Sequence, residues 1–216
     1  MSKKQGERKE NKTGFMDELI ERCKLEKKNR GVIQGLVYIP NFLTEKEEID
    51  LLQFLNCQKW NTVLKRRTIH FGYTYNYRQR SVTEDDYLGK LPSEFVWIKE
   101  RIRNCGVSDL DFDQVIVNEY LPGQGIGAHI DQQQMFGPDV ITISLGCKVP
   151  MVFTDRGGNT THDVWLDRKS LALLSGDARY KWTHSITPKI SDIDPETGFA
   201  MKRNTRVSIT FRKVNK

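Results

Sequence analysis

The sequence lacks the features of membrane and secreted proteins. No apolar run in its 216 residues approaches the roughly 18 residues that a membrane-spanning helix needs. The polar start, residues 1–14, is charged, but no apolar stretch with a cleavage site follows it, so we expect no secretory signal. With 38% hydrophobic and 29% charged residues, the composition is typical of a globular protein. We therefore expect an intracellular protein without a membrane partner.

Cysteine is scarce and scattered. Four cysteines contain no C-x-x-C pair, which argues against a zinc ribbon and a disulfide framework and suits a reducing compartment. Repeats and low-complexity blocks are absent too. A chain of this length is enough for one large domain, with or without an appendage.

Residues 31–216 also carry almost no net charge. Residues 1–30 hold ten Lys or Arg against six Asp or Glu, a net charge of +4, so the other 186 residues carry only +2 of the total of +6. The charge alone is therefore weak support for a nucleic-acid partner. We expect residues 1–30 to form a basic tail with a short helix, and a solvated tail explains them as well as an RNA-binding arm does. Residues 31–216 are expected to form the domain.

Helical patterns come first in the domain and strand patterns follow. Apolar spacing predicts helices in 15–30, in 45–57 after the T-E-K-E capping box at Thr44, and in 91–105. From about residue 111, short strand-like runs alternate with Gly, Pro and Asn turns, which is typical of a sandwich or jelly roll. The fold class is therefore mainly β with supporting helices. The polar segment 188–204 is interpreted as a loop.

A possible metal site lies in the stretch NEYLPGQGIGAHIDQQ. In a strand, His129 and Asp131 point to the same side, so both can reach one ion. His184 follows another strand-like run and is the candidate third ligand. Two histidines and a carboxylate form the facial arrangement of non-heme Fe(II) oxygenases, although zinc accepts the same ligand types. Alone, H-x-D is common, and a lone histidine is more often a core residue.

The run RVSITFR strengthens this interpretation. Alternation puts Val207, Ile209 and Phe211 on one face and Arg206, Ser208, Thr210 and Arg212 on the other. If the second face lines the metal cavity, its arginines need anionic partners, which a dicarboxylate co-substrate supplies. An exposed edge strand with basic side chains explains the same pattern equally well.

Five motifs then follow one another in order. They are N-x-Y at Asn118 and Tyr120, H-x-D at 129–131, S-L-G at 144–146, GDARYKWTH at 176–184 and R-x-S-x-T-F-R at 206–212. Together they resemble the AlkB family of Fe(II)- and 2-oxoglutarate-dependent dioxygenases, over about residues 110–214 and more weakly back to residue 33. Within that family the sequence is most similar to the AlkB-type domain that acts on the modified wobble uridine of transfer RNA.

The resemblance implies both a fold and a reaction. It implies a double-stranded β-helix (jelly roll, cupin-like) over 110–214, after a helical and lid region at 31–109. It makes His129, Asp131 and His184 the ligands of Fe(II). Decarboxylation of 2-oxoglutarate to succinate with O2 would then be coupled to hydroxylation of a substrate C–H bond. An N-methyl group hydroxylated in this way sheds formaldehyde, whereas a carbon side chain gives a stable alcohol.

The same resemblance assigns the co-substrate residues. Arg206, helped by the hydroxyl of Tyr120, would pair with the distal carboxylate of 2-oxoglutarate. Asn118 and Arg212 would hold the end nearer the metal. Ser208 belongs to the same group and stands where the repair enzymes of the family have asparagine.

Substrate contacts are expected from the aromatic stretch HFGYTYNY and from residues near the metal. The stretch is flanked by arginines at 66, 67, 78 and 80, so it suits a lid over a flipped-out base, although a hairpin with a tyrosine face in the core is the alternative. In repair members an acid stands where this chain has Gln133, which puts direct repair in doubt. The expected substrate-binding residues are Arg66, Arg67, His70, Tyr73, Tyr75, Gln133 and Arg179.

The sequence thus predicts a dioxygenase that hydroxylates or demethylates a modified nucleic-acid base, in RNA or tRNA rather than DNA. Repair of alkylated DNA and hydroxylation of a protein side chain are the alternatives within the same chemistry. A non-catalytic cupin-like binding module is the alternative of another class. Because the wobble-uridine proteins carry RNA-recognition and methyltransferase domains, we also expect that a separate partner supplies one of these functions.

Overall fold

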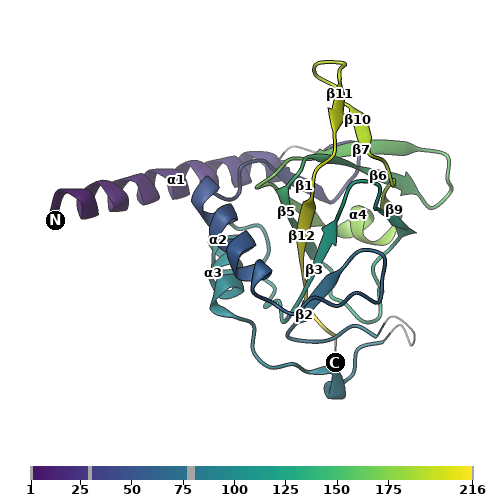
Figure 1. Ribbon diagram of the computed structural model, residues 1–216, viewed down its shortest axis with the longest axis horizontal. Coiled ribbons are helices and arrows are strands. Elements are labelled where there is room, and N and C mark those ends of the chain that lie inside the picture. The colour runs from purple at the N-terminus through teal and green to yellow at the C-terminus, as the bar shows by residue number, and fades with distance from the viewer. Residues whose placement is uncertain (1, 29–30, 77–80, 216) are drawn as a thin grey trace.

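Two antiparallel sheets form the body of the protein (Figure 1), in a computed structural model that describes residues 2–28, 31–76 and 81–215. The larger sheet has the order β1-β8-β5-β12-β3-β2 and the smaller one the order β4-β9-β6-β7. The larger sheet consists of β1 (Leu36–Ile39), β2 (Thr68–Phe71), β3 (Gln114–Tyr120), β5 (Val140–Gly146), β8 (Leu171–Leu174) and β12 (Arg206–Arg212). The smaller sheet consists of β4 (Ile126–His129), β6 (Val149–Asp155), β7 (Thr161–Leu166) and β9 (Trp182–Ile186). This architecture confirms the predicted mainly β jelly roll.

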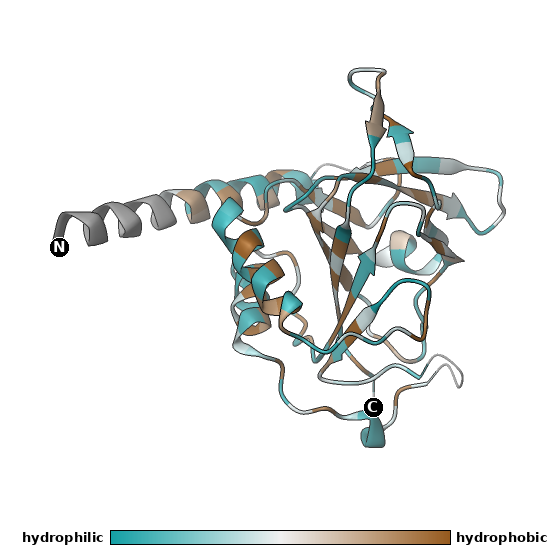
Figure 2. Cartoon of the chain, in the orientation of Figure 1, coloured by the Kyte–Doolittle hydropathy of each residue, from teal (hydrophilic) through white to brown (hydrophobic). Residues whose placement is uncertain are grey.

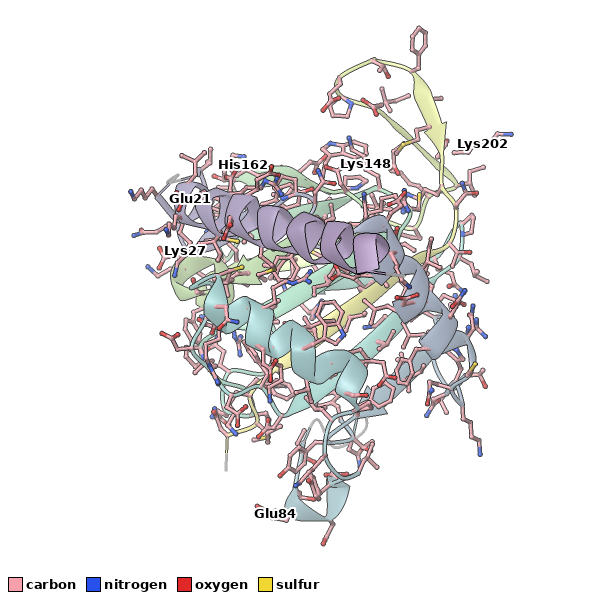
Figure 3. All side chains as sticks on the ribbon, turned by 90° about the vertical axis from the view of Figure 1, so that its left-hand side faces the viewer. Glu21, Lys27, Glu84, Lys148, His162 and Lys202 are labelled. Atoms are coloured by element: carbon pink, nitrogen blue, oxygen red, sulfur yellow. The ribbon has the colours of Figure 1, made fainter. Side chains whose placement is uncertain are left out.

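Helices cover the outer face of the larger sheet, and Figure 3 looks onto them with the strands behind. They are α1 (Ser2–Lys28), α2 (Glu45–Asn56) and α3 (Ser93–Asn104), while α4 (Gly176–Tyr180) and the 3-10 turn η1 (Glu84–Asp86) are short. The capping box at Thr44 forms as the sequence predicts. Helix α1 is longer than predicted, since it begins at Ser2 rather than near residue 15. Among the described residues, no helix is long and apolar enough to cross a membrane.

The strands divide their side chains between two apolar layers. On β12, Val207, Ile209 and Phe211 pack toward the helices, where burial of each such side chain contributes roughly 1.5–3 kcal/mol. The alternate residues of β12 face the space between the sheets. Figure 2 shows hydrophobic and hydrophilic residues alternating along the strands and along the helices that cover them. The interpretation of β12 as an exposed edge strand is therefore wrong, because the strand pairs with β3 and β5 on its two sides.

The segment expected to be a loop, 188–204, contains a hairpin instead. Strands β10 (Ser191–Ile193) and β11 (Ala200–Lys202) pair antiparallel. A buried ion pair fixes the base of this hairpin, with Arg203 Nε 2.5 Å and Nη2 2.8 Å from the Asp192 carboxylate. Arg203 also donates to the carbonyl of Thr187 at 2.7 Å. Strands of three residues with polar composition carry no strong periodicity, which is why the sequence did not predict them.

The aromatic alternation of HFGYTYNY ends at Gly72. This residue has φ +77°, and a Cβ there would lie 1.8 Å from the carbonyl oxygen of Asp113, so only glycine fits. The chain turns at this point, so Phe71 packs toward the helices while Tyr73 packs in a different cluster. Alternate positions of a continuous strand would place Phe71 and Tyr73 on one face, and the turn at Gly72 separates them. Residues 77–80, which include the arginines expected at the far end of the lid, lie outside the described residues.

Candidate metal centre and its cleft

The pairing of β4 with β9 brings the two candidate histidines together. His129 lies opposite His184 in this pairing, and the centroids of their rings are 4.3 Å apart. Asp131 follows β4 closely, and its Oδ2 lies 3.6 Å from Nε2 of His184. One ligand atom from each of the three residues lies within 4.8 Å of the others, the only such group in the part of the chain that is described. One ion can therefore be bound by all three side chains.

The surroundings of Asp131 and His184 keep both side chains in the deprotonated state that a metal ligand needs. Burial alone would raise the pKa of Asp131, but the positive charge of Arg212, and next the ring of His184, keep this pKa below its usual range. A nitrogen of Arg212 donates to Oδ1 of the same carboxylate. Burial lowers the pKa of His184 to about 4, so its ring is neutral at pH 7. Metal ligands must be deprotonated, and both residues meet that condition.

The tautomer of His129 is set by the backbone. Its Nδ1 lies 2.8 Å from the carbonyl oxygen of Gly127, which can only accept, so Nδ1 donates and Nε2 is left for a metal. Two imidazoles and one carboxylate on one side of an ion leave its other positions open, as in non-heme Fe(II) oxygenases. The ligand set therefore fits Fe(II) with a bound co-substrate.

A buried guanidinium with unpaired nitrogens lies deeper between the sheets. Arg206 is 1% exposed, and burial lowers its pKa. Its Nη2 donates to the hydroxyl of Ser144 at 2.9 Å, while Nε and Nη1 have no partner among the described residues. The ring of Tyr120 lies 5.4 Å from the guanidinium carbon. An unpaired buried charge is costly, so this site fits a carboxylate group.

Two further predicted residues line the cavity between Arg206 and the metal ligands. Asn118 and Ser208 are direct neighbours in the pairing of β3 with β12. Ser144, the hydrogen-bond partner of Arg206, was not predicted as a site residue, although it lies in the S-L-G motif. Thr142 was not predicted either; its hydroxyl oxygen lies 3.1 Å from that of Thr210, which the alternation of β12 had placed on this face. Their position follows from strand pairing, which the sequence alone does not specify.

An open cleft of about 420 Å³ leads from the metal ligands to the surface. The substrate-binding candidates Arg66 and Tyr75 line it. Nε of Arg66 donates to Oδ1 of Asn118 at 2.9 Å, which turns this guanidinium toward the site. Phe136 lines the same cleft, with its ring centroid 5.9 Å from that of Tyr75. The cleft thus combines cationic and aromatic side chains.

Arg67, in contrast, does not line this cleft. Its Nε and Nη2 bind the two carboxylate oxygens of Glu119 at 2.6 and 2.7 Å, and its guanidinium lies 4.5 Å from the ring of Trp60. Arg66 lies in a bend before β2, and the two neighbours bind different residues of β3, Asn118 for Arg66 and Glu119 for Arg67. The expectation that Arg67 contacts substrate is not supported by this geometry.

Arg179 and Gln133 also lie differently from their expected place. Arg179 is 2% exposed and donates to the backbone carbonyls of Asp131, Gln132, Phe136 and Gly137 at 2.7 to 3.3 Å. It therefore holds the loop after the metal-binding aspartate and has no surface for a substrate. Gln133 is exposed and donates to the carbonyl of Tyr180 at 3.3 Å, while its neighbour Gln132 lines the cleft.

The remaining two substrate-binding candidates, His70 and Tyr73, make contacts within the protein. The backbone N–H of Tyr75 donates to Nδ1 of His70 at 3.0 Å, and burial, followed by the charge of Arg212, lowers the pKa of His70 to about 4. Tyr73 is 6% exposed and packs against Tyr87, with ring centroids 5.0 Å apart. Tyr73 is thus a packing residue rather than a substrate contact.

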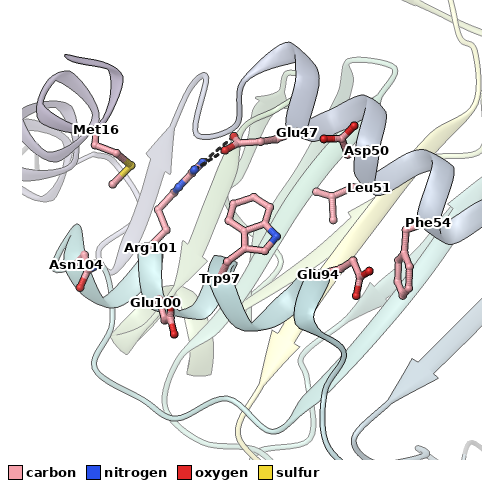
Figure 4. Close-up of a pocket in the computed structure, with 10 residues that line it drawn as sticks. All are labelled: Met16, Glu47, Asp50, Leu51, Phe54, Glu94, Trp97, Glu100, Arg101 and Asn104. Carbon is pink, nitrogen blue, oxygen red and sulfur yellow. Dashed lines mark hydrogen bonds and ion pairs between the residues drawn. The ribbon is translucent and has the colours of Figure 1, made fainter. Parts of the chain in front are cut away.

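A second hollow lies on the helical side of the larger sheet, away from the metal ligands. It is about 540 Å³ in volume and lies between α2 and α3 (Figure 4). Trp97 lies in it beneath the guanidinium of Arg101, 4.7 Å away, and Arg101 pairs with Glu47 at 2.5 Å. No metal-binding group of the described residues lies here. The chemistry is therefore assigned to the cleft at the histidines.

Comparison with known proteins agrees with this site. Residues 35–212 match the model of the 2OG-Fe(II) oxygenase superfamily. The chain belongs to this superfamily. As a 2OG-Fe(II) oxygenase it uses Fe(II), 2-oxoglutarate and O2, which confirms the predicted enzyme class and cofactors. Family membership and the complete ligand set therefore favour an enzyme over the non-catalytic binding module.

Individual relatives of this oxygenase carry AlkB names, which confirms the resemblance. The mouse protein tRNA (carboxymethyluridine(34)-5-O)-methyltransferase ALKBH8 is 35% identical over 84% of the chain, and the chain spans 31% of its length. The zebrafish (Danio rerio) protein Probable RNA/DNA demethylase ALKBH6 is 29% identical over 83% of the chain and 85% of its own length. The solved structure of OsALKBH1 superposes with a TM-score of 0.62 at 19% identity, covering 83% of this chain and 96% of that one, which supports the fold.

Proposed function

We propose that this 2OG-Fe(II) oxygenase hydroxylates or demethylates a modified base of nucleic acid, and that its substrate is RNA, tRNA in particular, rather than DNA. The observation that carries the proposal is the open cleft beside the metal ligands. Arg66 and Arg212 bring positive charge to it, and Tyr75 and Phe136 bring aromatic rings. Its one acid, Asp131, already pairs with Arg212. Such a cleft can accept a nucleotide base among the aromatic rings, while the phosphates of the same strand contact the basic side chains.

Different side chains position the two ends of 2-oxoglutarate. Arg206, with Ser144 and Tyr120 beside it, binds the distal carboxylate of 2-oxoglutarate. Asn118 and Arg212 line the same cavity as Arg206 and the metal ligands, and we assign them to the end of 2-oxoglutarate nearer the metal. Bound Fe(II), with 2-oxoglutarate and O2, supplies oxidation of a C–H bond together with release of succinate and CO2.

The residues after the metal-binding aspartate favour RNA modification over DNA repair. The AlkB-type repair enzymes have an acid where this chain has Gln133, and Gln132, which lines the cleft, is neutral as well. A neutral amide accepts and donates hydrogen bonds, so it suits an uncharged base better than a positively charged alkylated one. The name of the mouse relative refers to a tRNA uridine, and that of the zebrafish relative to RNA and DNA.

An accessory partner belongs to the same proposal. The mouse relative is named as a tRNA methyltransferase. We propose that this oxygenase likewise acts together with an RNA-binding or methyltransferase unit.

Mass spectrometry of nucleosides tests the reaction. Total tRNA and a methylated DNA oligonucleotide are incubated with the protein, Fe(II), ascorbate and 2-oxoglutarate, with Asp131→Ala as the matched inactive control. We expect an added oxygen or a lost methyl group in a tRNA nucleoside with wild-type protein alone. Change in the DNA and not in the tRNA would overturn the RNA preference, and turnover of 2-oxoglutarate without change in either would overturn the nucleic-acid substrate.

A further inference from the structure

Three cationic residues lie in the two segments that flank the turn between β3 and β4, strands that both contribute residues to the cleft. Nε2 of Gln124, in this turn, donates to the carbonyl of Lys65 at 2.8 Å. The N–H of Gly123, next to it, donates to the carbonyl of Lys189 at 2.9 Å. The turn is thus held between the segment of Lys65 and Arg66 on one side and the segment of Lys189 on the other.

None of these three cations has an acidic partner in residues 2–28, 31–76 and 81–215. Lys65 and Lys189 are exposed, and their ammonium groups make no ion pair there. Arg66 is half-buried, and its one hydrogen bond within those ranges is the one from Nε to Asn118. The two terminal nitrogens of its guanidinium are therefore available to a ligand in the cleft.

Several basic side chains elsewhere in the domain are neutralised. Ion pairs within 3.4 Å bind Arg67 to Glu119, Lys148 to Asp167, Lys181 to Asp177, Arg203 to Asp192 and Lys213 to Asp113. Lys65, Arg66 and Lys189 are instead among the basic side chains that have no acidic partner in the described residues, and they lie on either side of one turn. Their charge is available to attract an anionic chain.

We propose that Lys65, Arg66 and Lys189 form a phosphate-binding rim for a single-stranded nucleic acid. Arg66 binds the phosphate of the nucleotide whose base enters the cleft, because its guanidinium is the only one of the three cations that lines the cleft. Lys65 and Lys189 bind the phosphates of adjoining nucleotides as point charges. A guanidinium offers a phosphate two parallel hydrogen bonds, whereas an ammonium attracts it without fixing its orientation. This rim rests on the proposed nucleic-acid substrate and adds how that substrate is held.

Salt-dependent binding of a fluorescent 12-nucleotide single-stranded RNA tests the rim. Arg66→Ala is compared with Arg67→Ala, which removes the same charge one residue away but from the side turned to Glu119. We expect Arg66→Ala to weaken binding about 10-fold and to reduce the slope of log K against log salt by about 0.7, the value for one phosphate contact on a single strand. Lys65→Ala with Lys189→Ala should reduce the slope about twice as much, and Arg67→Ala should change it little.

A conservative variant separates orientation from charge. Arg66→Lys keeps the charge, so the salt slope should remain near that of the wild type, while the KM for an RNA substrate rises and the KM for 2-oxoglutarate stays unchanged. Circular dichroism verifies that each variant is folded. A rise in the KM for 2-oxoglutarate instead would assign Arg66 to the co-substrate and overturn the rim.

The outcomes distinguish the rim from the proposed reaction. Equal losses of RNA affinity in Arg66→Ala and Arg67→Ala would mean that only total charge matters, and the rim would be refuted even if tRNA is modified. Conversely, an RNA that binds with the expected slopes but is never oxidised would refute the reaction and leave the rim intact.

Discussion

Replacement of Arg206 by methionine tests the central electrostatic argument about the co-substrate site. The guanidinium is 1% exposed, has one hydrogen-bond partner, and leaves two nitrogens unpaired. Methionine fills a similar volume without a charge, so Arg206→Met removes an unpaired buried cation. We expect the protein without 2-oxoglutarate to be as stable as the wild type or more stable, because the cost of burying that charge disappears.

Binding of 2-oxoglutarate should respond in the opposite direction. A hydrogen bond to a charged group contributes about 1.5–3 kcal/mol, and two nitrogens of Arg206 are available to the carboxylate. A loss of about 3 kcal/mol, the lower end for two bonds, weakens binding on the order of 100-fold. Ligand present at 100 times its Kd stabilises a protein by about 2.7 kcal/mol, and after such a loss the same concentration gives only about 0.4 kcal/mol.

Calorimetry and thermal unfolding measure these effects under anaerobic conditions with Mn(II) in place of iron. For a domain of this size, about 2.7 kcal/mol corresponds to a rise in Tm of roughly 5–10 °C, which should shrink to about 1 °C in Arg206→Met. Arg203→Met is the matched control, since Arg203 is as buried but fully paired with Asp192. That variant should lose stability and keep its affinity for 2-oxoglutarate. Unchanged affinity in Arg206→Met, or a loss of stability equal to that of Arg203→Met, would refute the reasoning.

Four further predictions follow from the same geometry. Asp131→Ala should abolish succinate formation and weaken Mn(II) binding at least 100-fold, as measured by calorimetry; undiminished turnover would remove this residue from the metal site. Arg179→Lys should weaken Mn(II) binding about 10-fold with little effect on the KM for RNA, because one ammonium group cannot bind all four backbone carbonyls. A raised KM for RNA with unchanged Mn(II) binding would instead make Arg179 a substrate residue. Gly72→Ala should lower the free energy of unfolding, measured with urea, by about 2–4 kcal/mol, because the new Cβ clashes with the carbonyl of Asp113. Gly106→Ala is the control, because its φ is also positive but no atom is close, and it should cost about 1 kcal/mol. Equal effects of the two substitutions would contradict the clash. Because the pKa of His70 is lowered to about 4, the unfolded chain takes up a proton below pH 6.5 that the folded chain does not. The free energy of unfolding should therefore fall between pH 6.5 and 4 by up to about 1.4 kcal/mol per pH unit. His70→Gln should reduce this pH dependence, and an unaltered pH dependence would show that the ring titrates normally.

Some elements could be predicted because they depend on near neighbours in the chain. The capping box at Thr44 and the buried face of α3 follow from spacings of three and four residues. The division of β12 into an apolar and an arginine-bearing face follows from the two-residue period of a strand. In the same way, the spacing of His129 and Asp131 placed both on one side of the chain.

Other features depended on contacts that a local pattern does not contain. Arg66 and Arg67 are the same residue type side by side, and only the position of Asn118 and Glu119 on β3 decides which one faces the cleft. The hairpin at 191–202 depends on an ion pair between Asp192 and Arg203, in a segment with the composition of a loop.

The sequence by itself determined the chemistry of this protein, through two histidines, one aspartate and an arginine-bearing strand that stand within five ordered motifs resembling those of AlkB-family oxygenases. The tertiary structure alone decided which side chains act at the site. It placed His129 opposite His184, left two nitrogens of Arg206 without a partner, and committed Arg179 to the backbone. The physical reason is that side-chain type and local spacing are carried by the chain, whereas burial and pairing arise only when distant strands meet.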